Sequence, residues 1–209
     1  MTSPHRTPVS RQQAVGSAIR AETRRRLMLA AGEEFAERGY TAATVGRIAK
    51  RAGVTVQTLY LAWGSKRTLL HGYIESVLAG SAGSPDEVVE RFVGLQATQI
   101  VDELAATVGL VASRSATAWK LYRDAAAADP EIAADWQELQ TMRRATMRTI
   151  VGMIPPDALR AGLTAESAAD TAWVIGSPES YDLLVRTSGY TVDEFVEWMT
   201  STLRSALLN

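Results

Sequence analysis

The stretch from Ala52 to Lys66 concentrates side chains that can recognise a partner through hydrogen bonds and charge. Gln57 carries an amide that donates and accepts at once, Tyr60 carries a hydroxyl and Lys66 carries an ammonium. Hydroxyl and ammonium groups suit anionic oxygens, whereas a planar amide can make a bidentate pair of hydrogen bonds. The residue types therefore favour binding chemistry.

Composition argues against catalysis and metal binding. The chain has no cysteine, and its two histidines, His5 and His71, lie far apart in the sequence. Disulfides, structural zinc and thiol catalysis are therefore excluded. Asp124, Asp129 and Glu138 could act as general acids or bases, but no nucleophile or cofactor motif accompanies them. We expect no cofactor and no enzyme activity, with an all-α enzyme as the remote alternative.

Charge is divided unevenly along the chain. Residues 1–70 carry twelve Lys and Arg against four Asp and Glu, a net charge of +8, and residues 71–209 sum to −9. One end of the chain therefore suits a polyanion and the other end repels it. No uninterrupted apolar run reaches about 18 residues, and the first residues lack the apolar core of a secretory signal. We expect a soluble, cytoplasmic protein with no membrane partner.

Helix start signals recur along the chain and predict an all-α fold. Ser84 precedes Pro85, with Glu87 in the capping-box position, and the same logic recurs at "DPE" (129–131), "SPE" (177–179) and "TVDE" (191–194). Apolar residues between these signals follow the helical period, and no alternating run typical of a strand is present. We expect about nine to eleven helices and no sheet.

Two short helices are predicted around the opening stretch. Thr44 should cap a helix over 45–52, which Gly53 ends, and Thr55 should cap a second one that runs to about Ala62. With a longer helix over 21–38 in front, this is a helix-turn-helix arrangement. Its expected core is Phe35, Val45, Ile48, Ala49, Val54 and Leu59.

Three segments are expected from the patterning. Residues 1–20 lack apolar periodicity and predict a disordered basic arm. Residues 21–80 predict the helix-turn-helix domain with its connecting helix. Small residues and a proline over 79–85 mark a boundary, and residues 81–209 predict a second, larger helical domain.

The stretch "FAERGYTAATVGRIAKRAGVTVQTLYLAWGSKRTLL" resembles the DNA-binding domain of TetR-family transcriptional regulators, over roughly residues 21–75. The resemblance implies a bacterial regulator with an N-terminal three-helix DNA-binding domain and a C-terminal helical bundle that binds an effector and dimerises. It implies a homodimer on double-stranded DNA with a pseudo-palindromic operator, and repression as the default. A helix-turn-helix protein whose bundle is a protein–protein adaptor without a small ligand stays as the alternative.

The candidate DNA contacts combine this resemblance with the chemistry of the residues. Gln57 can pair with adenine N6 and N7, and Val56 can meet a thymine methyl. The resemblance assigns phosphate contacts to the hydroxyl and ammonium groups. Gly46 occupies a position where some relatives have a side chain that reads bases, and Arg47 is the nearby candidate for that contact. The full set is Thr44, Arg47, Thr55, Val56, Gln57, Tyr60 and Lys66.

Each of these contacts has a purely structural alternative. Thr44 and Thr55 can act as helix caps alone, and Tyr60 can pack in the core. The run Arg24–Arg26 and the arm before it can follow the DNA backbone or enter a minor groove, or can be a solvated helix start.

The resemblance also implies an effector pocket among the middle helices. Bulky aromatic and methionine side chains there can line an adaptable apolar cavity, although they also fill ordinary cores. The candidates are Phe92, Trp119, Tyr122, Trp136, Met142 and Met147. Gln99, Arg114 or Arg123 could add a polar anchor, and a largely apolar organic ligand is preferred.

By the same resemblance, the last two long helices, at about 165–187 and 191–208, form the dimer interface. The candidate contacts are Trp173, Phe195, Trp198, Met199 and Leu203. Periodicity shows that these residues share apolar faces and does not show which partner each face meets. Packing within one chain is therefore the open alternative for all five.

Overall fold

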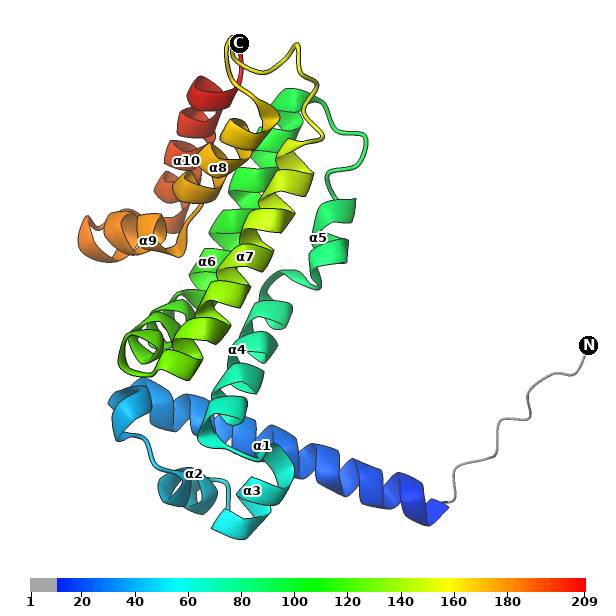
Figure 1. Ribbon diagram of the computed structural model, residues 1–209, viewed down its shortest axis with the longest axis vertical. Helices are drawn as coiled ribbons and strands as arrows, with labels where there is room; N and C mark the ends of the chain where they lie inside the picture. Colours follow the sequence, from blue (N-terminus) through cyan, green and yellow to red (C-terminus); the bar gives the residue numbers. More distant parts are fainter. Residues whose placement is uncertain (1–10) are drawn as a thin grey trace, which may run out of the picture. The chain divides into compact units, whose positions relative to one another are not determined.

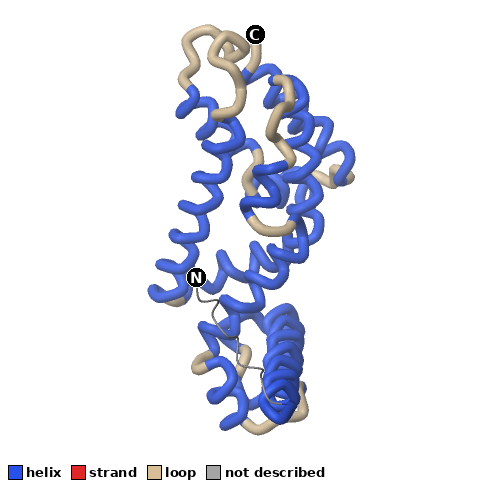
Figure 2. The backbone as a smooth tube through the Cα atoms, turned by 90° about the vertical axis from the view of Figure 1, so that its right-hand side faces the viewer, coloured by secondary structure: helices blue, strands red, loops and turns tan. Residues whose placement is uncertain are grey.

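The computed structural model describes residues 11–209, which are helical with no strand among them. An isolated β-bridge joins Leu159 and Leu208. The expected all-α fold is confirmed, and Figure 2 shows only helices and loops in the described part of the chain. The chain divides into two compact units, one that ends at Tyr73 and one that spans Ile74–Asn209.

The first unit is a small three-helix domain followed by the start of a connecting helix. Its elements are α1 (Arg11–Ala42), α2 (Val45–Arg51), α3 (Val56–Trp63) and the beginning of α4 (Lys66–Ala82) (Figure 1). Gly39 interrupts α1 with φ 71° and ψ 166°, so its main rod ends at Arg38, as expected. The chain needs glycine there because this left-handed φ is strained for other residues.

The beginning of α1 differs from the sequence-based expectation. Residues 11–20 were expected to be disordered, yet they form the first turns of α1. The segment contains no proline that would interrupt a helix. Because extending an existing helix is far easier than nucleating a new one, the packed turns from Leu27 onwards stabilise the helical conformation of residues 11–20. The remainder of the expected arm, residues 1–10, lies outside the described residues.

Buried side chains hold the three helices of the first unit together. Of the expected core, Phe35, Ile48, Ala49 and Leu59 are at most 1% exposed. The expected core residues Val45 and Val54 are only partly buried. The core also includes Leu27, Ala30, Ala31, Ala43, Ala52, Leu69 and Leu70.

The second unit is a helical bundle. Its remaining elements are α5 (Pro85–Glu90), α6 (Ala97–Ala128), α7 (Pro130–Val151), α8 (Ala165–Ile175), α9 (Pro178–Tyr181), the π-helix η1 (Asp182–Thr187) and α10 (Val192–Leu207). The long helices α6 and α7 lie side by side, α10 packs on α6, and α8 packs on both α7 and α10 (Figure 1). None of the described helices is long and apolar enough to cross a membrane.

The expected helix starts of the second unit are confirmed. Ser84 and Thr191 form capping boxes with Glu87 and Glu194, and Asp129 accepts hydrogen bonds from the first turn of α7. One expectation is wrong, because residues 165–187 do not form a single helix. The chain leaves α8 at Ile175 and restarts at Pro178, since proline has no amide hydrogen to continue the ladder and the hydroxyl of the residue before it caps α9.

The capping boxes predict an acid limb in the stability of the protein. The Glu194 carboxylate accepts hydrogen bonds from the backbone nitrogen (2.7 Å) and hydroxyl (2.9 Å) of Thr191, which hold the pKa of Glu194 below its usual 4.5. Glu87 is bonded to Ser84 in the same way, and its pKa is also lowered. Because the pKa of each carboxyl group is lower in the folded state than in the unfolded state, the ionised group stabilises the fold at pH values above its unfolded-state pKa. This stabilisation is lost as the pH falls through the folded-state pKa.

We therefore expect a melting temperature that is flat near neutral pH and falls below about pH 4.5. Glu194→Gln keeps an acceptor oxygen without the charge, so its acid limb should be shallower. Thermal unfolding of both chains by circular dichroism at a series of pH values measures this. Superimposable acid limbs would contradict the assignment.

Candidate nucleic-acid interface

Two side-chain caps and one glycine build the turn between α2 and α3. The Thr44 hydroxyl accepts from the backbone nitrogen of Arg47 (3.4 Å), and the Thr55 hydroxyl accepts from that of Thr58 (3.1 Å). Gly53, which follows the C-cap residue Ala52 of α2, takes a positive φ of 65°. Both expected caps and the expected glycine turn are confirmed, so the sequence itself sets the start of α3.

The outward face of α3 is unusually apolar for an exposed surface. Leu59 is fully buried, whereas Leu61 is 82% exposed, Tyr60 49% and Val56 38%. Gln57 is also exposed on this helix. Core packing of Tyr60 was the alternative to an outward role, and its exposure favours the outward one. Side chains of this kind on a short capped helix offer an apolar and hydrogen-bonding face to a partner.

A buried carboxylate organises the cationic side of α2. Glu34 of α1 is 2% exposed and lies within 4 Å of three guanidinium groups, those of Arg38 (3.3 Å), Arg47 (3.7 Å) and Arg51 (3.3 Å). The Arg47 side chain stays 51% exposed beside it. The carboxylate therefore restrains the arginine that the sequence proposes as a DNA contact, and leaves it at the surface.

Arg51 fastens α2 to α1. Its guanidinium pairs with Glu37 (2.7 Å) and Glu33 (3.1 Å) as well as with Glu34. The hydrogen bond from Arg51 lowers the pKa of Glu37 and keeps that carboxylate charged. The acids of α1 thus neutralise Arg51, and this arginine contributes little to an attractive field.

The arginine run of α1 has a structural role that the sequence did not reveal. Arg24 donates to the carbonyl oxygen of Ala62, at the end of α3, and its guanidinium lies 4.0 Å from the Trp63 ring. Arg26 donates to the carbonyl oxygen of Ala52, at the end of α2. The two residues of each hydrogen bond are separated by 38 and 26 positions in the sequence, respectively, and no local pattern predicts such pairs. The arginines bind free carbonyls at two helix ends, where positive charge is favoured.

Lys66 is also held inside the first unit. Its ammonium donates to the carbonyl oxygens of Tyr40 (2.9 Å) and Ala43 (3.1 Å), and it lies 4.1 Å from the Tyr40 ring centroid. This differs from the expected phosphate contact. Tyr40 and Ala43 lie at the C-terminal end of α1 and just after it, where a partly buried ammonium suits the carbonyl oxygens of a helix end.

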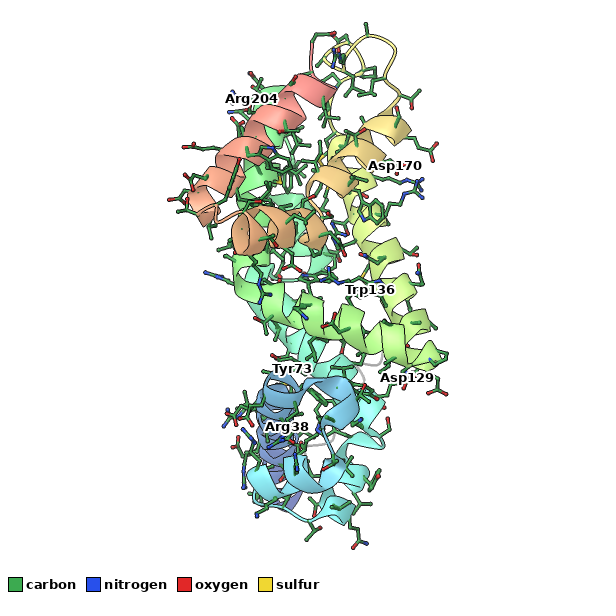
Figure 3. All side chains as sticks on the ribbon, turned by 90° about the vertical axis from the view of Figure 1, so that its left-hand side faces the viewer. Arg38, Tyr73, Asp129, Trp136, Asp170 and Arg204 are labelled. Carbon is green, nitrogen blue, oxygen red and sulfur yellow. The ribbon has the colours of Figure 1, made fainter. Side chains whose placement is uncertain are left out.

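The structure sorts the six candidate effector residues into different environments. Trp136 of α7 meets the rings of Trp119 (5.6 Å between centroids) and Tyr122 (5.7 Å) of α6 edge-on. Figure 3 marks Trp136 in the second unit. Phe92 and Met147 are buried in the main core of the bundle, and Met142 is 49% exposed. The structure thus brings three of the six together as an aromatic cluster between two long helices.

Three of the expected dimer contacts pack within the chain itself, which is the alternative that the sequence left open. Phe195, Met199 and Leu203 are all 0% exposed and belong to the core of the second unit, so their side chains cannot reach a partner chain. Trp173 and Trp198 are partly buried at the edge of this core. Periodicity placed all five on apolar faces and could not tell which face turns inward.

Exposed apolar residues of the same region were missed. Leu183 of η1 is 62% exposed, Val174 of α8 57%, and Tyr190, between η1 and α10, 37%. In the sequence, apolar residues on more than one side of α8 could have indicated Val174, whereas no such pattern indicated Leu183 or Tyr190. We use the name C-terminal apolar patch for Val174, Leu183 and Tyr190, which are exposed on successive parts of the segment from α8 to the start of α10.

The polar residues considered as ligand anchors have other partners. Arg123 pairs with Asp182 (3.0 Å) and Glu179 (3.3 Å), Arg114 donates to the Ser81 carbonyl oxygen, and Gln99 completes the capping box of α6. In residues 11–209, no three His, Cys, Asp or Glu side chains are grouped so that they could hold a metal ion.

The position of Lys66 predicts a loss of stability when its ammonium is removed. Hydrogen bonds from a charged donor contribute about 1.5–3 kcal/mol each, and here two carbonyls would lose their partner, so Lys66→Ala should cost about 2 kcal/mol or more of unfolding free energy. Lys50→Ala, an exposed lysine on α2, is the matched control and should change stability by less than about 0.5 kcal/mol. Chemical denaturation measures both, and equal midpoints would argue against the internal role.

Comparisons with known proteins agree with this architecture. Residues 27–73 match the family model of bacterial regulatory proteins, tetR family. Native NalD, the secondary repressor of the MexAB-OprM multidrug efflux pump in Pseudomonas aeruginosa, is 18% identical with a TM-score of 0.72, over 91% of this chain and 98% of that one. A transcriptional regulator from Aquifex aeolicus is 16% identical with a TM-score of 0.68, over 88% and 98%. FadR from Bacillus subtilis, in complex with stearoyl-CoA, is 19% identical with a TM-score of 0.63, over 85% and 96%.

At these identities the solved structures show a shared fold, and the family model adds the identity of the domain that carries α2 and α3. The match ends at the residue where the first compact unit ends. Residues 27–73 therefore carry the domain of the bacterial regulatory proteins of the tetR family, and the whole chain shares its fold with regulators such as NalD.

Proposed function

We propose that this protein is a homodimeric repressor of the TetR family that binds a pseudo-palindromic operator through α3 and leaves it when a small organic effector, largely apolar in character, binds the second unit. The outward face of α3 is the observation that carries the proposal. Its side chains are exposed at the start of a short capped helix, which is the part of a recognition helix that lies nearest to base edges.

The side chains of α3 support direct reading of a short sequence. The amide of Gln57 suits adenine N6 and N7, and the exposed Val56 suits a thymine methyl group. Thr44 and Thr55 organise the backbone N–H groups at the starts of α2 and α3, and such groups bind phosphate. Arg47 and Tyr60 are the exposed candidates for further contacts to the DNA backbone.

Dimerisation follows from the small reach of one helix. One recognition helix reads a few base pairs, and a two-fold partner places a second one about 34 Å away on the same face of the duplex. The C-terminal apolar patch supports an interface between copies, because exposed large apolar side chains on successive elements favour burial against a partner. NalD, which shares the fold, is described as a repressor, and this supports repression here.

The aromatic cluster between α6 and α7 supports an effector role for the second unit. Trp119 and Tyr122 are buried, and Trp136 is partly exposed beside them. Aromatic side chains on facing helices of a bundle favour organic ligands. FadR is described in complex with stearoyl-CoA, so a protein of this fold accommodates an acyl ligand.

Selection of bound fragments from a random duplex library tests the DNA-binding function. We expect enrichment of a pseudo-palindrome with half-sites about one helical turn or more apart, and a dimer mass in solution. No preference over a scrambled competitor at near-physiological ionic strength would overturn the proposal. A protein that binds its operator but is stabilised only by a protein partner, and by no small molecule in a thermal-shift screen, would instead indicate the adaptor alternative.

Gln57 should determine one base position of the selected site. Gln57→Ala is expected to cost about 1–3 kcal/mol against the selected operator and to relax the preference at that position, because the bidentate contact is lost. Gln137→Ala, which removes an exposed glutamine of α7, is the control and should leave the binding unchanged. Gel-shift titrations on the selected operator and its single-base variants measure both, and an unchanged base preference in Gln57→Ala would refute the contact.

The C-terminal apolar patch should be sensitive to charge. Leu183→Glu is expected to weaken the dimer at least tenfold, because burial of a carboxylate without a partner is costly. Val93→Glu is the control, because it places the same charge at a valine between α5 and α6 that is 67% exposed, and it should leave the mass in solution unchanged. Analytical ultracentrifugation at several concentrations measures the shift. A Leu183→Glu protein that dimerises as well as the unsubstituted chain would remove this patch from the interface.

A further inference from the structure

Arg143 of α7 is a partly buried cation without an acidic partner. Its guanidinium donates to the side-chain oxygen of Gln140 (3.0 Å) and to the carbonyl oxygens of Gly176 (3.0 Å) and Trp173 (3.4 Å). In residues 11–209 no carboxylate lies within 4 Å of it. Three of its five N–H donors are thus used, and all three partners are neutral oxygens.

The surrounding arginines show that this arrangement is unusual within the bundle. Arg144, the next residue along, pairs with Asp170 at 2.5 Å, and Arg148, one turn further, pairs with Glu166 at 2.6 Å. Glu179 acts on Arg143 only through space, because Arg123 binds its carboxylate at 3.3 Å. Each of these other arginines is neutralised by an acid of the chain.

Burial without a counter-charge has a measurable consequence. Desolvation lowers the pKa of Arg143 to about 10, far below the ordinary value for a guanidinium. The side chain still carries its proton at neutral pH. The chain itself therefore compensates this positive charge only in part, through neutral oxygens, which makes the guanidinium a strong site for an anion.

Two tryptophans and an orphaned donor adjoin this charge. The guanidinium carbon lies 5.8 Å from the ring centroids of both Trp119 and Trp173, and Trp119 continues into the aromatic cluster through Trp136. The indole nitrogen of Trp173 is buried and has no hydrogen-bond partner among the described residues. A buried donor without an acceptor costs free energy of folding. This unpaired indole N–H group is an observation independent of the missing counter-charge of Arg143.

We propose that the effector is an amphipathic organic anion, whose carboxylate or similar acidic group binds Arg143 and whose apolar body lies against Trp119, Trp136 and Trp173. This assignment rests on the proposed effector role of the second unit and adds an acidic group to the largely apolar effector proposed there. The anion supplies the missing counter-charge and an acceptor next to the unpartnered indole nitrogen. Aromatic rings that flank a guanidinium leave its edge open to an acid while they bury the apolar part of a ligand.

The same contacts connect the anchor to the end of α8. The guanidinium binds the carbonyl oxygens of Trp173 and Gly176, where α8 ends and the chain turns towards α9. An anion that draws the guanidinium to itself weakens these bonds between α7 and α8. Val174 of the C-terminal apolar patch lies between the two carbonyls, so ligand binding acts on the segment proposed for dimerisation.

A pair of fluorescent dyes tests the charge requirement. The dye 1-anilinonaphthalene-8-sulfonate carries an anionic group, and N-phenyl-1-naphthylamine has the same aromatic frame without it. Energy transfer from the tryptophans to the bound dye reports binding near the aromatic cluster. We expect the full chain to bind the anionic dye at least tenfold more tightly than the neutral one.

Arginine substitutions then locate the anchor. Arg143→Gln should lower the affinity for the anionic dye about tenfold or more and should change the affinity for the neutral dye by less than about twofold. Arg143→Lys keeps the positive charge but loses the planar guanidinium group, so this variant should retain part of the preference for the anionic dye over the neutral one. Arg144→Gln is the matched control on the same helix, because that guanidinium already pairs with Asp170, and its dye preference should equal that of the unsubstituted protein.

Competition in the unsubstituted protein gives a readout that does not depend on how a variant folds. Decanoate should displace the neutral dye at a concentration at least tenfold lower than decanol, which has the same chain length. Equal displacement by the two compounds, or an equal loss of both dyes in Arg143→Gln, would overturn the proposal and leave Arg143 as a clamp between α7 and α8. An equal loss of dye preference in Arg144→Gln would overturn it as well.

Operator binding separates this assignment from the proposed function. If decanoate binds with the expected preference but the selected operator stays bound, the anion site stands and the release mechanism fails. If no operator can be selected at all, the DNA-binding function fails, and the dye and competition results still decide the role of Arg143.

Discussion

Anchoring of α3 on α1 is the constraint on which the rest of the first unit depends. The helix has eight residues, too few to be stable alone in water, and its outward side chains are exposed. Leu59 fixes its inner face in the core, and Arg24 of α1 binds the carbonyl at its end. Only a helix held in this way can present Gln57 and its neighbours without burying them.

The cationic character of the first unit is divided between internal bonds and the surface. Arg24, Arg26, Arg51 and Lys66 are all engaged by carbonyls or carboxylates of the same unit. Net charge alone therefore overstates how many cations face a polyanion. Of the proposed DNA contacts, Gln57, Val56, Tyr60 and Arg47 stay exposed.

The second unit separates its apolar residues into three environments with different consequences. The inner faces of α6, α7, α8 and α10 make an ordinary core, which absorbs Phe195 and Leu203. An aromatic cluster with Trp119 and Trp136 lies next to the uncompensated Arg143. The C-terminal apolar patch is exposed. The proposed ligand binding and association thus rest on residues other than those of the core, although all of them share the same helical period.

The sequence alone determined the all-α class, the caps at Thr44, Thr55 and Thr191, and the turn at Gly53. These features are local, because the relevant hydrogen bonds join residues within a few positions and the left-handed φ is a property of glycine. It could not show that Lys66 and Arg24 bind distant carbonyls, nor which apolar face of α10 turns inward. Only the tertiary structure decided the partners of each charge and each face, because those partners come from helices that are far apart along the chain.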